Sequence, residues 1–326
     1  MRRFIAGFDI GGTKIAVSLG TKNGKILAKK VFSSGKSRPV RESIRQIRYA
    51  FSELLQAVGA HGRAPLLSKH LLGIGVAVPG AVDPRREVIL KSPNLPSWEK
   101  FQLKKFLAKE FRVPIWIEND ANAAALGEQY FGSGKGIGHF IYLTVSTGIG
   151  SGIVMNGSLI RGASGMAGEV GHMTIVPNGL LCACGKRGCL EAYSSGTAVA
   201  NHVKQALKNG AKSRFFQRMK LNHITGQLVT DAAQNYRDGV AIQARTMAAD
   251  FLGIGLANLI NLLNPERIIL GGGVTENLDH FWTPMMSSVR REAWPMSLRA
   301  CSIVRSTLGT KVGDLGAIAI VLDAAR

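Results

Sequence analysis

The chain has 326 residues, of which 46% are hydrophobic, 19% are charged and 39 are glycine. This length is enough for two domains, and the composition is that of a globular protein. A formal net charge of +20 raises the possibility of nucleic-acid or membrane-surface binding. The basic residues are spread over several segments, however, and only 7% of residues are aromatic. We therefore predict a basic solvated surface and no nucleic-acid or membrane partner.

No secretion signal or membrane span is predicted. The start, MRRFIAGFDIGGTK, lacks an apolar stretch long enough for a signal peptide. The longest apolar run, Phe251–Leu263, is too short to cross a bilayer and predicts a buried helix. Three of the four cysteines crowd between positions 182 and 189, unlike those of a secreted disulfide scaffold. We therefore expect a reducing, cytoplasmic compartment.

The first part of the chain predicts a β-β-β-α-β-α-β unit. Asn23-Gly24 is a hairpin signal, so the three N-terminal strands are expected to be antiparallel. Helices are predicted where apolar residues recur at helical spacing. The predicted elements are strands at Phe4–Ile10, Ile15–Leu19 and Ile26–Phe32, a helix at Arg41–Val58, a strand at Leu71–Val78, a helix at Phe101–Phe111, a strand at Val113–Glu118 and a helix from about Ala121.

The same plan returns in the second part of the chain. The predicted elements there are strands at His139–Val145 and Gly152–Met155, a helix at Val240–Leu263, a strand at Arg267–Leu270 and a last helix at Leu315–Ala325. Two similar halves, each opening with a strand, a glycine-rich turn and a strand, indicate a duplicated α/β fold with a cleft between them. We expect a small domain over residues 1–120, a large domain over 121–311, and the helix near 312–326 packing back on the small domain.

Three glycine-rich turns are candidate phosphate or nucleotide contacts: Asp9–Lys14, Ser146–Gly150 and Gly271–Gly273. In a tight turn without Cβ atoms, successive backbone N–H groups can cradle phosphate oxygens. Asp9 could hold Mg²⁺ through water. Each turn alone is better explained by ordinary hairpin glycines, and none matches the standard nucleotide motifs. The occurrence of two such turns at equivalent places in the two halves favours a ligand.

With DIGGTK at residues 9–14 and STGIG at residues 146–150, the chain resembles the ROK kinases, in the group that folds like actin, the Hsp70 chaperones and hexokinase. The resemblance covers essentially the whole chain. It implies two ribonuclease-H-like domains, each with a mixed sheet flanked by helices, which grip ATP in the cleft between them. The residues expected to contact the nucleotide are Asp9, Gly11, Gly12, Thr13, Lys14, Thr147, Gly148, Gly272 and Gly273.

Four residues have the spacing and chemistry of a metal site, H-x₉-C-x-C-x₄-C, formed by His172, Cys182, Cys184 and Cys189. Three thiolates and an imidazole are the ligand set of a tetrahedral structural zinc. Buried free cysteines or a disulfide are the alternatives, and both explain the clustering poorly. A catalytic zinc is disfavoured because four protein ligands leave no open position.

The stretch Gly171–Glu191 also matches the ROK signature GHxxxxxxxxxCxCGxxGCxE at each specified place. The resemblance implies that zinc pins the loop that carries the sugar contacts, so that Glu169, His172 and Glu191 face the sugar hydroxyls. One ring nitrogen of His172 could bind zinc while the other donates to the sugar.

Asn119 and Asp120 lie where a predicted strand gives way to an alanine-rich helix. By position alone, helix capping is the better interpretation of Asp120. The resemblance instead implies that Asp120 is the catalytic base and that Asn119 binds the sugar. Gly80 and Asn94 resemble further sugar contacts of the family, and each is equally well explained as an ordinary turn residue.

Together these features predict an ATP-dependent hexose kinase that transfers the γ-phosphate of Mg-ATP to the 6-hydroxyl of a hexose, with glucose as the first choice. N-acetylmannosamine and N-acetylglucosamine are the alternative substrates. ROK proteins also include sugar-responsive transcription repressors, which carry a winged helix-turn-helix domain before the sugar-binding part. Because DIGGTK begins at residue 9, we expect a kinase. Similar proteins are usually dimers or tetramers, so a homodimer or homotetramer is expected.

Overall fold

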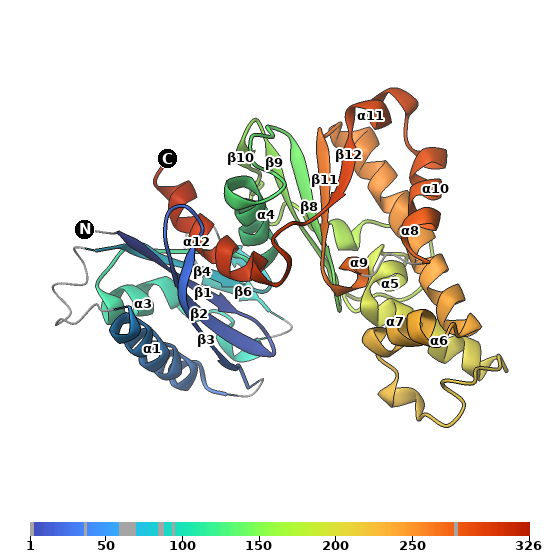
Figure 1. Ribbon diagram of the computed structural model, residues 1–326, viewed down its shortest axis with the longest axis horizontal. Coiled ribbons are helices and arrows are strands. Elements are labelled where there is room, and N and C mark those ends of the chain that lie inside the picture. Colours follow the sequence, from blue (N-terminus) through green and yellow to red (C-terminus); the bar gives the residue numbers. More distant parts are fainter. Residues whose placement is uncertain (1–2, 36–37, 59–69, 84–87, 93–94, 277–279) are drawn as a thin grey trace. The chain divides into compact units, whose positions relative to one another are not determined.

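A computed structural model of the protein describes residues 3–35, 38–58, 70–83, 88–92, 95–276 and 280–326 (Figure 1). The chain divides into two compact units. Unit 1 contains Met1–Ile137, Gly152–Gly168 and Thr307–Arg326, and unit 2 contains Gly138–Ser151 and Glu169–Ser306.

The first part of the chain forms the elements that its apolar pattern predicts, with a short extra hairpin, β5–β6. In chain order these elements are β1 (Phe4–Ile10), β2 (Lys14–Gly20), β3 (Ile26–Ser33), α1 (Val40–Ala57), β4 (Leu71–Val78), β5 (Ala81–Asp83), β6 (Val88–Lys91), η1 (Pro96–Trp98), α3 (Leu103–Phe111), β7 (Ile115–Asn119) and α4 (Asp120–Phe131). The predicted antiparallel arrangement of the first three strands is confirmed.

The second part of the chain contains more helices than the pattern predicted. Its elements are β8 (Phe140–Val145), β9 (Ile149–Met155), β10 (Ser158–Leu159), η2 (Val170–His172), α5 (Glu191–Ser194), α6 (Gly196–Lys208), η3 (Leu221–His223), α7 (Gly226–Asn235), α8 (Gly239–Leu263), β11 (Arg267–Gly271), α9 (Gly273–Glu276), α10 (Trp282–Glu292), α11 (Pro295–Ala300), β12 (Ser302–Arg305), η4 (Gly309–Lys311) and α12 (Val312–Ala324).

The two five-stranded sheets confirm the predicted duplication. Their strand orders, β3-β2-β1-β4-β7 and β10-β9-β8-β11-β12, are the same when β1 is matched with β8 and the other strands follow. β1 is antiparallel to β2 and parallel to β4. β9 is likewise antiparallel to β10, and β11 is parallel to both β8 and β12. Each sheet is therefore mixed, as the α/β prediction required.

Each face of the first sheet is covered by helices (Figure 1). Residues at alternate positions of a strand point to opposite faces, so Phe8 and Asp9 lie on different sides of β1. The Phe8 side packs against α1 and α3, where its ring meets Phe51 edge-on with the ring centroids 5.7 Å apart. The Asp9 side packs against α12, which contacts both β1 and β4. The C-terminal helix therefore covers the sheet face from which Asp9 projects.

Close approach of α12 to the sheet depends on a glycine in β4. A Cβ atom at Gly75 would lie 1.9 Å from the carbonyl oxygen of Ala317 on α12. Replacing Gly75 by Ala is expected to lower the free energy of unfolding by about 3 kcal/mol, because the backbone of α12 would have to shift. Urea denaturation measures this change. The matched control is Gly239→Ala at the start of α8, where an added Cβ meets nothing within 4 Å. Equal losses in the two variants would contradict the prediction.

The predicted buried helix corresponds to α8. Among the described residues it is the one helix that has the length and apolar composition of a membrane-spanning segment. Half of its most apolar window is buried inside the protein, and it packs against α6, α7 and α10. The core helix of a globular protein has the same composition, so this pattern is weak support for a membrane span.

Candidate functional site

The predicted first phosphate loop is a tight turn between β1 and β2. The N–H of Gly11 donates to the carbonyl of Lys14 at 2.9 Å, which closes the turn. Ser34 then holds the turn from the side, because its hydroxyl donates to the Gly12 carbonyl at 2.7 Å and its N–H to the Thr13 carbonyl at 3.0 Å. The N–H groups of Gly12 and Thr13 have no partner among the described residues. They are therefore available to an anionic ligand.

Asp9 stands near the end of β1 in a partly buried position, beside Gly313 of α12. The pKa of this carboxyl is raised from 3.8 to about 6, and burial is the largest cause. The negative charge of Asp314 contributes to this rise, and the cations of Lys14 and Lys29 oppose it. A carboxylate that is poorly solvated in the free protein gains from a nearby divalent cation. This environment fits the predicted contact of Asp9 with hydrated Mg²⁺.

The raised pKa of Asp9 predicts that Asp9→Asn stabilises the protein at pH 8 in the absence of nucleotide and Mg²⁺. Because the native carboxyl has the higher pKa, the folded state binds more protons than the unfolded state between about pH 4 and pH 6. Stability is therefore lost as the pH rises through this range, and the full cost is present above it. The shift corresponds to about 3 kcal/mol. Urea denaturation from pH 5 to pH 8 measures it, and a difference between wild type and variant that does not grow with pH would contradict the prediction.

The second predicted phosphate loop is Ser146–Gly150. Its first three residues, Ser146–Gly148, occupy the equivalent place between β8 and β9, and its last two begin β9. The N–H of Ser146 donates to the Gly148 carbonyl at 2.9 Å, and the Thr197 hydroxyl donates to the Thr147 carbonyl at 2.7 Å. As in the first loop, nearby residues of the protein donate hydrogen bonds to the loop carbonyls. The N–H groups of Thr147 and Gly148 have no partner in the described part of the chain. The two loops therefore present similar donors.

The third glycine-rich turn lies beside the second loop within unit 2. Gly272 has a φ of +90°, and a Cβ atom there would lie 2.4 Å from the carbonyl oxygen of Val145 at the end of β8. Only glycine fits this conformation and this space. Gly273 is exposed and has open space around its Cα. The turn thus offers an accessible backbone surface next to the loop that is predicted to bind phosphate.

Glu191, a predicted sugar ligand, connects the second loop with the cysteine segment. Its Oε2 accepts a hydrogen bond from the N–H of Ile149 at 2.8 Å, and its Oε1 lies 3.8 Å from the Sγ of Cys182. A Cβ atom at Gly148 would lie 2.5 Å from the carboxylate of Glu191. The predicted nucleotide loop and the predicted sugar ligand are therefore in direct contact within unit 2.

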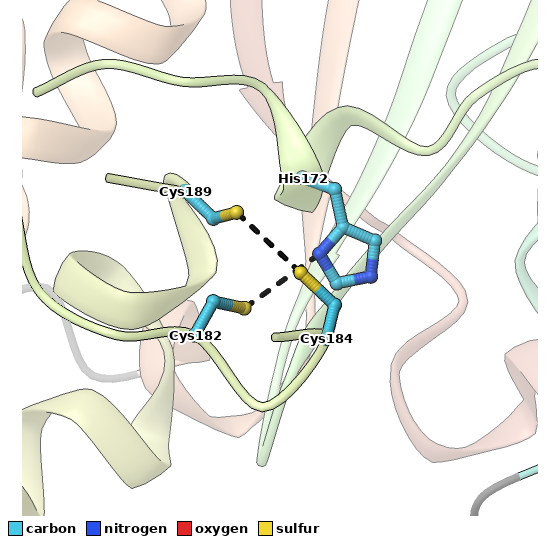
Figure 2. A group of neighbouring side chains, drawn as sticks. All are labelled: His172, Cys182, Cys184 and Cys189. Carbon is cyan, nitrogen blue, oxygen red and sulfur yellow. Dashed lines mark hydrogen bonds between the residues drawn. The ribbon is translucent and has the colours of Figure 1, made fainter. Parts of the chain in front are cut away.

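The structure brings the four predicted metal ligands together (Figure 2). The ligand atoms of His172, Cys182, Cys184 and Cys189 all lie within 4.8 Å of one another. The Sγ atoms of Cys184 and Cys189 are 3.7 Å apart, and the Sγ of Cys182 is 3.8 Å from Nδ1 of His172. Two thiolates bound tetrahedrally at 2.3 Å to one zinc would be about 3.8 Å apart. The donor set and its spacing therefore fit a four-coordinate zinc.

The protonation of the cysteines also suits a metal that displaces protons. Burial raises the pKa of Cys182 to about 12 and also raises that of Cys189. The backbone N–H of Lys186 lowers the pKa of Cys184. Without a metal, the two buried thiols are protonated at neutral pH, and a zinc ion would stabilise their thiolates.

The second ring nitrogen of His172 faces a predicted sugar ligand. Its Nε2 lies 3.9 Å from Oε2 of Glu169, whose side chain is 47% exposed. Nδ1 points instead to the thiol cluster. The two ring nitrogens therefore face different groups, and the role of His172 toward both a metal and a sugar stays a prediction.

In unit 1, Asn119 rather than Asp120 caps helix α4. Its side-chain oxygen accepts hydrogen bonds from the N–H groups of Ala121 at 2.9 Å and Asn122 at 3.1 Å. Its side-chain nitrogen donates to the carbonyl of Gly80 at 3.0 Å. Asp120 is the first residue of the helix, where its side chain is exposed and its Oδ1 accepts from the Ala121 N–H. Asn94 lies outside the described residues.

Sequence reasoning missed an ion pair between a buried carboxylate and a partly exposed arginine behind these residues. Nε of Arg161 donates to Oε2 of Glu118 at 2.7 Å, although the two residues are 43 positions apart. A carboxylate inside the apolar strand Ile115–Asn119 is a signal that a partner exists. Nothing in the pattern around Arg161 identifies that partner.

Comparisons with known proteins agree with this architecture. A profile of the ROK family matches residues 5–324. A glucokinase from Thermotoga maritima is 33% identical over 320 residues, which cover 98% of this chain and 97% of the relative. A putative xylose repressor from Caldicellulosiruptor is 34% identical over 98% of this chain and 78% of its own length.

One solved structure extends the comparison to three dimensions. A ROK family glucokinase from Streptomyces griseus, in complex with glucose and AMPPNP, superposes with a TM-score of 0.79 at 33% identity, covering 97% of this chain and 98% of the other. The fold is therefore that of the actin-like ATPases, as the resemblance implied. Because the family profile spans nearly the whole chain, the protein belongs to the ROK family.

Proposed function

We propose that the protein is an ATP-dependent hexose kinase that phosphorylates the 6-hydroxyl group of its sugar, with glucose as the first candidate. The observation that carries the proposal is the position of Asp120. Because Asn119 caps α4, Asp120 is not needed as the cap, and its exposed carboxylate stands at the first residue of the helix. The glucokinase relative and the solved glucokinase support the sugar class.

In the proposed reaction, Asp120 accepts the proton of the attacking 6-hydroxyl group as the new oxygen–phosphorus bond forms. Asn119 holds a sugar hydroxyl. Mg-ATP, when bound, supplies the γ-phosphoryl group, and its metal ion offsets the negative charge of the phosphate groups. Four N–H groups donate to phosphate oxygens in this proposal, those of Gly12, Thr13, Thr147 and Gly148. The carbonyl groups of the same residues accept hydrogen bonds from the protein, which fixes the two loops.

The cysteine cluster has a structural role in this proposal. A zinc held by His172, Cys182, Cys184 and Cys189 would fix the segment that carries Glu169 and Glu191, and these two carboxylates would accept hydrogen bonds from the sugar. Since three reduced thiols are needed for such a site, we propose the cytoplasm as the compartment.

A coupled ADP-release assay tests this function. Zinc-replete protein is incubated with Mg-ATP and, separately, glucose, mannose, N-acetylmannosamine and N-acetylglucosamine. We expect a large kcat/KM for at least one sugar, with glucose first. 6-Deoxyglucose is the matched control, because it keeps the other hydroxyls but lacks the nucleophile. It should inhibit the reaction with glucose and release no ADP. ADP release with 6-deoxyglucose equal to that with glucose would contradict transfer to the 6-hydroxyl.

A sugar sensor without kinase activity is the second candidate, because a putative xylose repressor is 34% identical to almost the whole chain. Isothermal titration calorimetry with glucose and with xylose separates the two functions. Sugar binding without ADP release from any sugar would favour the sensor, and turnover would favour the kinase.

A further inference from the structure

The carboxylate of Glu118 is buried directly behind the Asn119–Asp120 turn. Its side chain is 9% exposed. Oε1 accepts the N–H of Asn119 at 3.0 Å and the side-chain amide of Asn122 at 3.1 Å. Oε2 accepts Nε of Arg161 at 2.7 Å. Both oxygens are thus engaged, and two of the three donors belong to the segment that begins α4.

Arg161 reaches Glu118 from the segment that follows β10. Its side chain is 39% exposed, and its second contact is a hydrogen bond from the guanidinium to Asp323 of α12 at 3.2 Å. Among the described residues, Arg161 is the cation that pairs with Glu118. A buried carboxylate without a paired cation is strongly destabilised. The position of the Glu118 carboxylate therefore depends on Arg161.

We propose that Arg161 and Glu118 act as positioning residues for the reaction, a role that rests on the proposed kinase function. Arg161 holds the Glu118 carboxylate, and Glu118 holds the backbone N–H of Asn119 and the side chain of Asn122. These contacts fix the orientation of the first turn of α4. They thereby set the direction in which the Asp120 side chain points. Neither Arg161 nor Glu118 is required to touch the sugar.

The geometry makes this role specific to the pair. Asn119 makes its two capping bonds and its bond to Gly80 only while its backbone keeps the present orientation. Its N–H bond to Glu118 sets that orientation at the strand end. A displacement of about 1 Å at a catalytic group can lower a rate about 100-fold. Loss of the pair should therefore affect kcat far more than binding of the nucleotide.

The kinetic test uses Arg161→Met, Glu118→Gln and the double variant, with Asp323→Asn as the matched control. Asp323→Asn removes the negative charge of the other partner of Arg161 and leaves the bond to Glu118 in place. With the sugar that wild type turns over fastest, we expect kcat to fall at least tenfold in both single variants, with the KM for Mg-ATP within twofold. The double variant should be no slower than the slower single variant, because the two residues act as one unit. Arg161→Lys should recover part of the rate.

The proposal is overturned if Arg161→Met keeps kcat within twofold of wild type, or if Asp323→Asn lowers kcat as much as Arg161→Met. The second result would assign Arg161 to anchoring α12. All assays are run well below the melting temperature of each variant, so that unfolding does not imitate a catalytic loss.

A measurement without substrate separates this proposal from the kinase proposal. Hydrogen–deuterium exchange of the segment Asn119–Leu126 should be at least tenfold faster in Arg161→Met than in wild type, and unchanged in Asp323→Asn. If wild type phosphorylates no sugar, the kinase proposal fails and the exchange rates still decide whether the pair orders the start of α4. Unchanged exchange in Arg161→Met overturns the positioning role.

Discussion

Replacing Asp120 by Asn is expected to lower kcat for hexose phosphorylation roughly 10²–10⁴-fold. The amide has nearly the same shape as the carboxylate and can still hydrogen-bond to the sugar, but it cannot accept the proton of the attacking hydroxyl group. Since Asn119 provides the cap of α4 and the amide oxygen of the new residue can still accept the Ala121 N–H, the melting temperature should stay within a few degrees of wild type. The coupled ADP-release assay and a thermal melt measure the two quantities.

Asn119→Ala is the matched comparison for this prediction, because it removes the helix cap and leaves the proposed base, Asp120, in place. Loss of the cap should cost about 1 kcal/mol of stability, and loss of the proposed sugar contact should raise the sugar KM. Calorimetry should find that Asp120→Asn binds the sugar with an affinity similar to that of wild type. An Asp120→Asn variant with a near-normal kcat would exclude Asp120 as the base.

Replacing Cys189 by Ser is expected to abolish zinc binding and to remove most of the kinase activity. Cys189 is fully buried, and its sulfur lies 3.7 Å from that of Cys184. A hydroxyl group is a poor zinc ligand, so the remaining three ligands would hold the metal weakly. Because metal binding is coupled to folding of the surrounding segment, loss of the zinc should lower the free energy of unfolding by roughly several kcal/mol. Metal analysis of purified wild type should find one zinc per chain.

Cys301→Ser is the control for the zinc prediction. Cys301 is a free cysteine outside the cluster, so its replacement should retain the zinc and the activity. A chelator should lower the melting temperature of wild type and of Cys301→Ser, and it should leave Cys189→Ser unchanged. Wild-type protein that contains no zinc and does not respond to the chelator would contradict a structural metal.

Many helices and strands could be predicted from the sequence because their signals are local. β4 has the bounds that were predicted, Leu71–Val78, since its apolar run ends at Pro79-Gly80. The Asn156-Gly157 turn joins β9 and β10, with both residues at positive φ. The β5–β6 hairpin was missed because its strands have three and four residues, too short for a periodic pattern.

The candidate site could be predicted in part for the same reason. The four ligands of the cysteine cluster lie within 18 residues of one another, and the donors of each phosphate loop are adjacent along the chain. Short spacing is visible in a sequence. The contacts of Asp314 with Lys29 and of Arg161 with Glu118 join residues 285 and 43 positions apart. Such pairs depend on how α12 and the segment after β10 pack, which no local pattern encodes.

The amino-acid sequence by itself determined the family, the strand-turn-strand loops and the donor set of the cluster, because these depend on residue type and short-range spacing. Only the tertiary structure decided which residue caps α4, how strongly Asp9 is desolvated and which cation pairs with Glu118. These properties follow from burial and from contacts between distant segments. A capping bond requires the backbone of Asn119 to be oriented, and a raised pKa requires water to be excluded from Asp9. Both conditions arise only when the chain is folded.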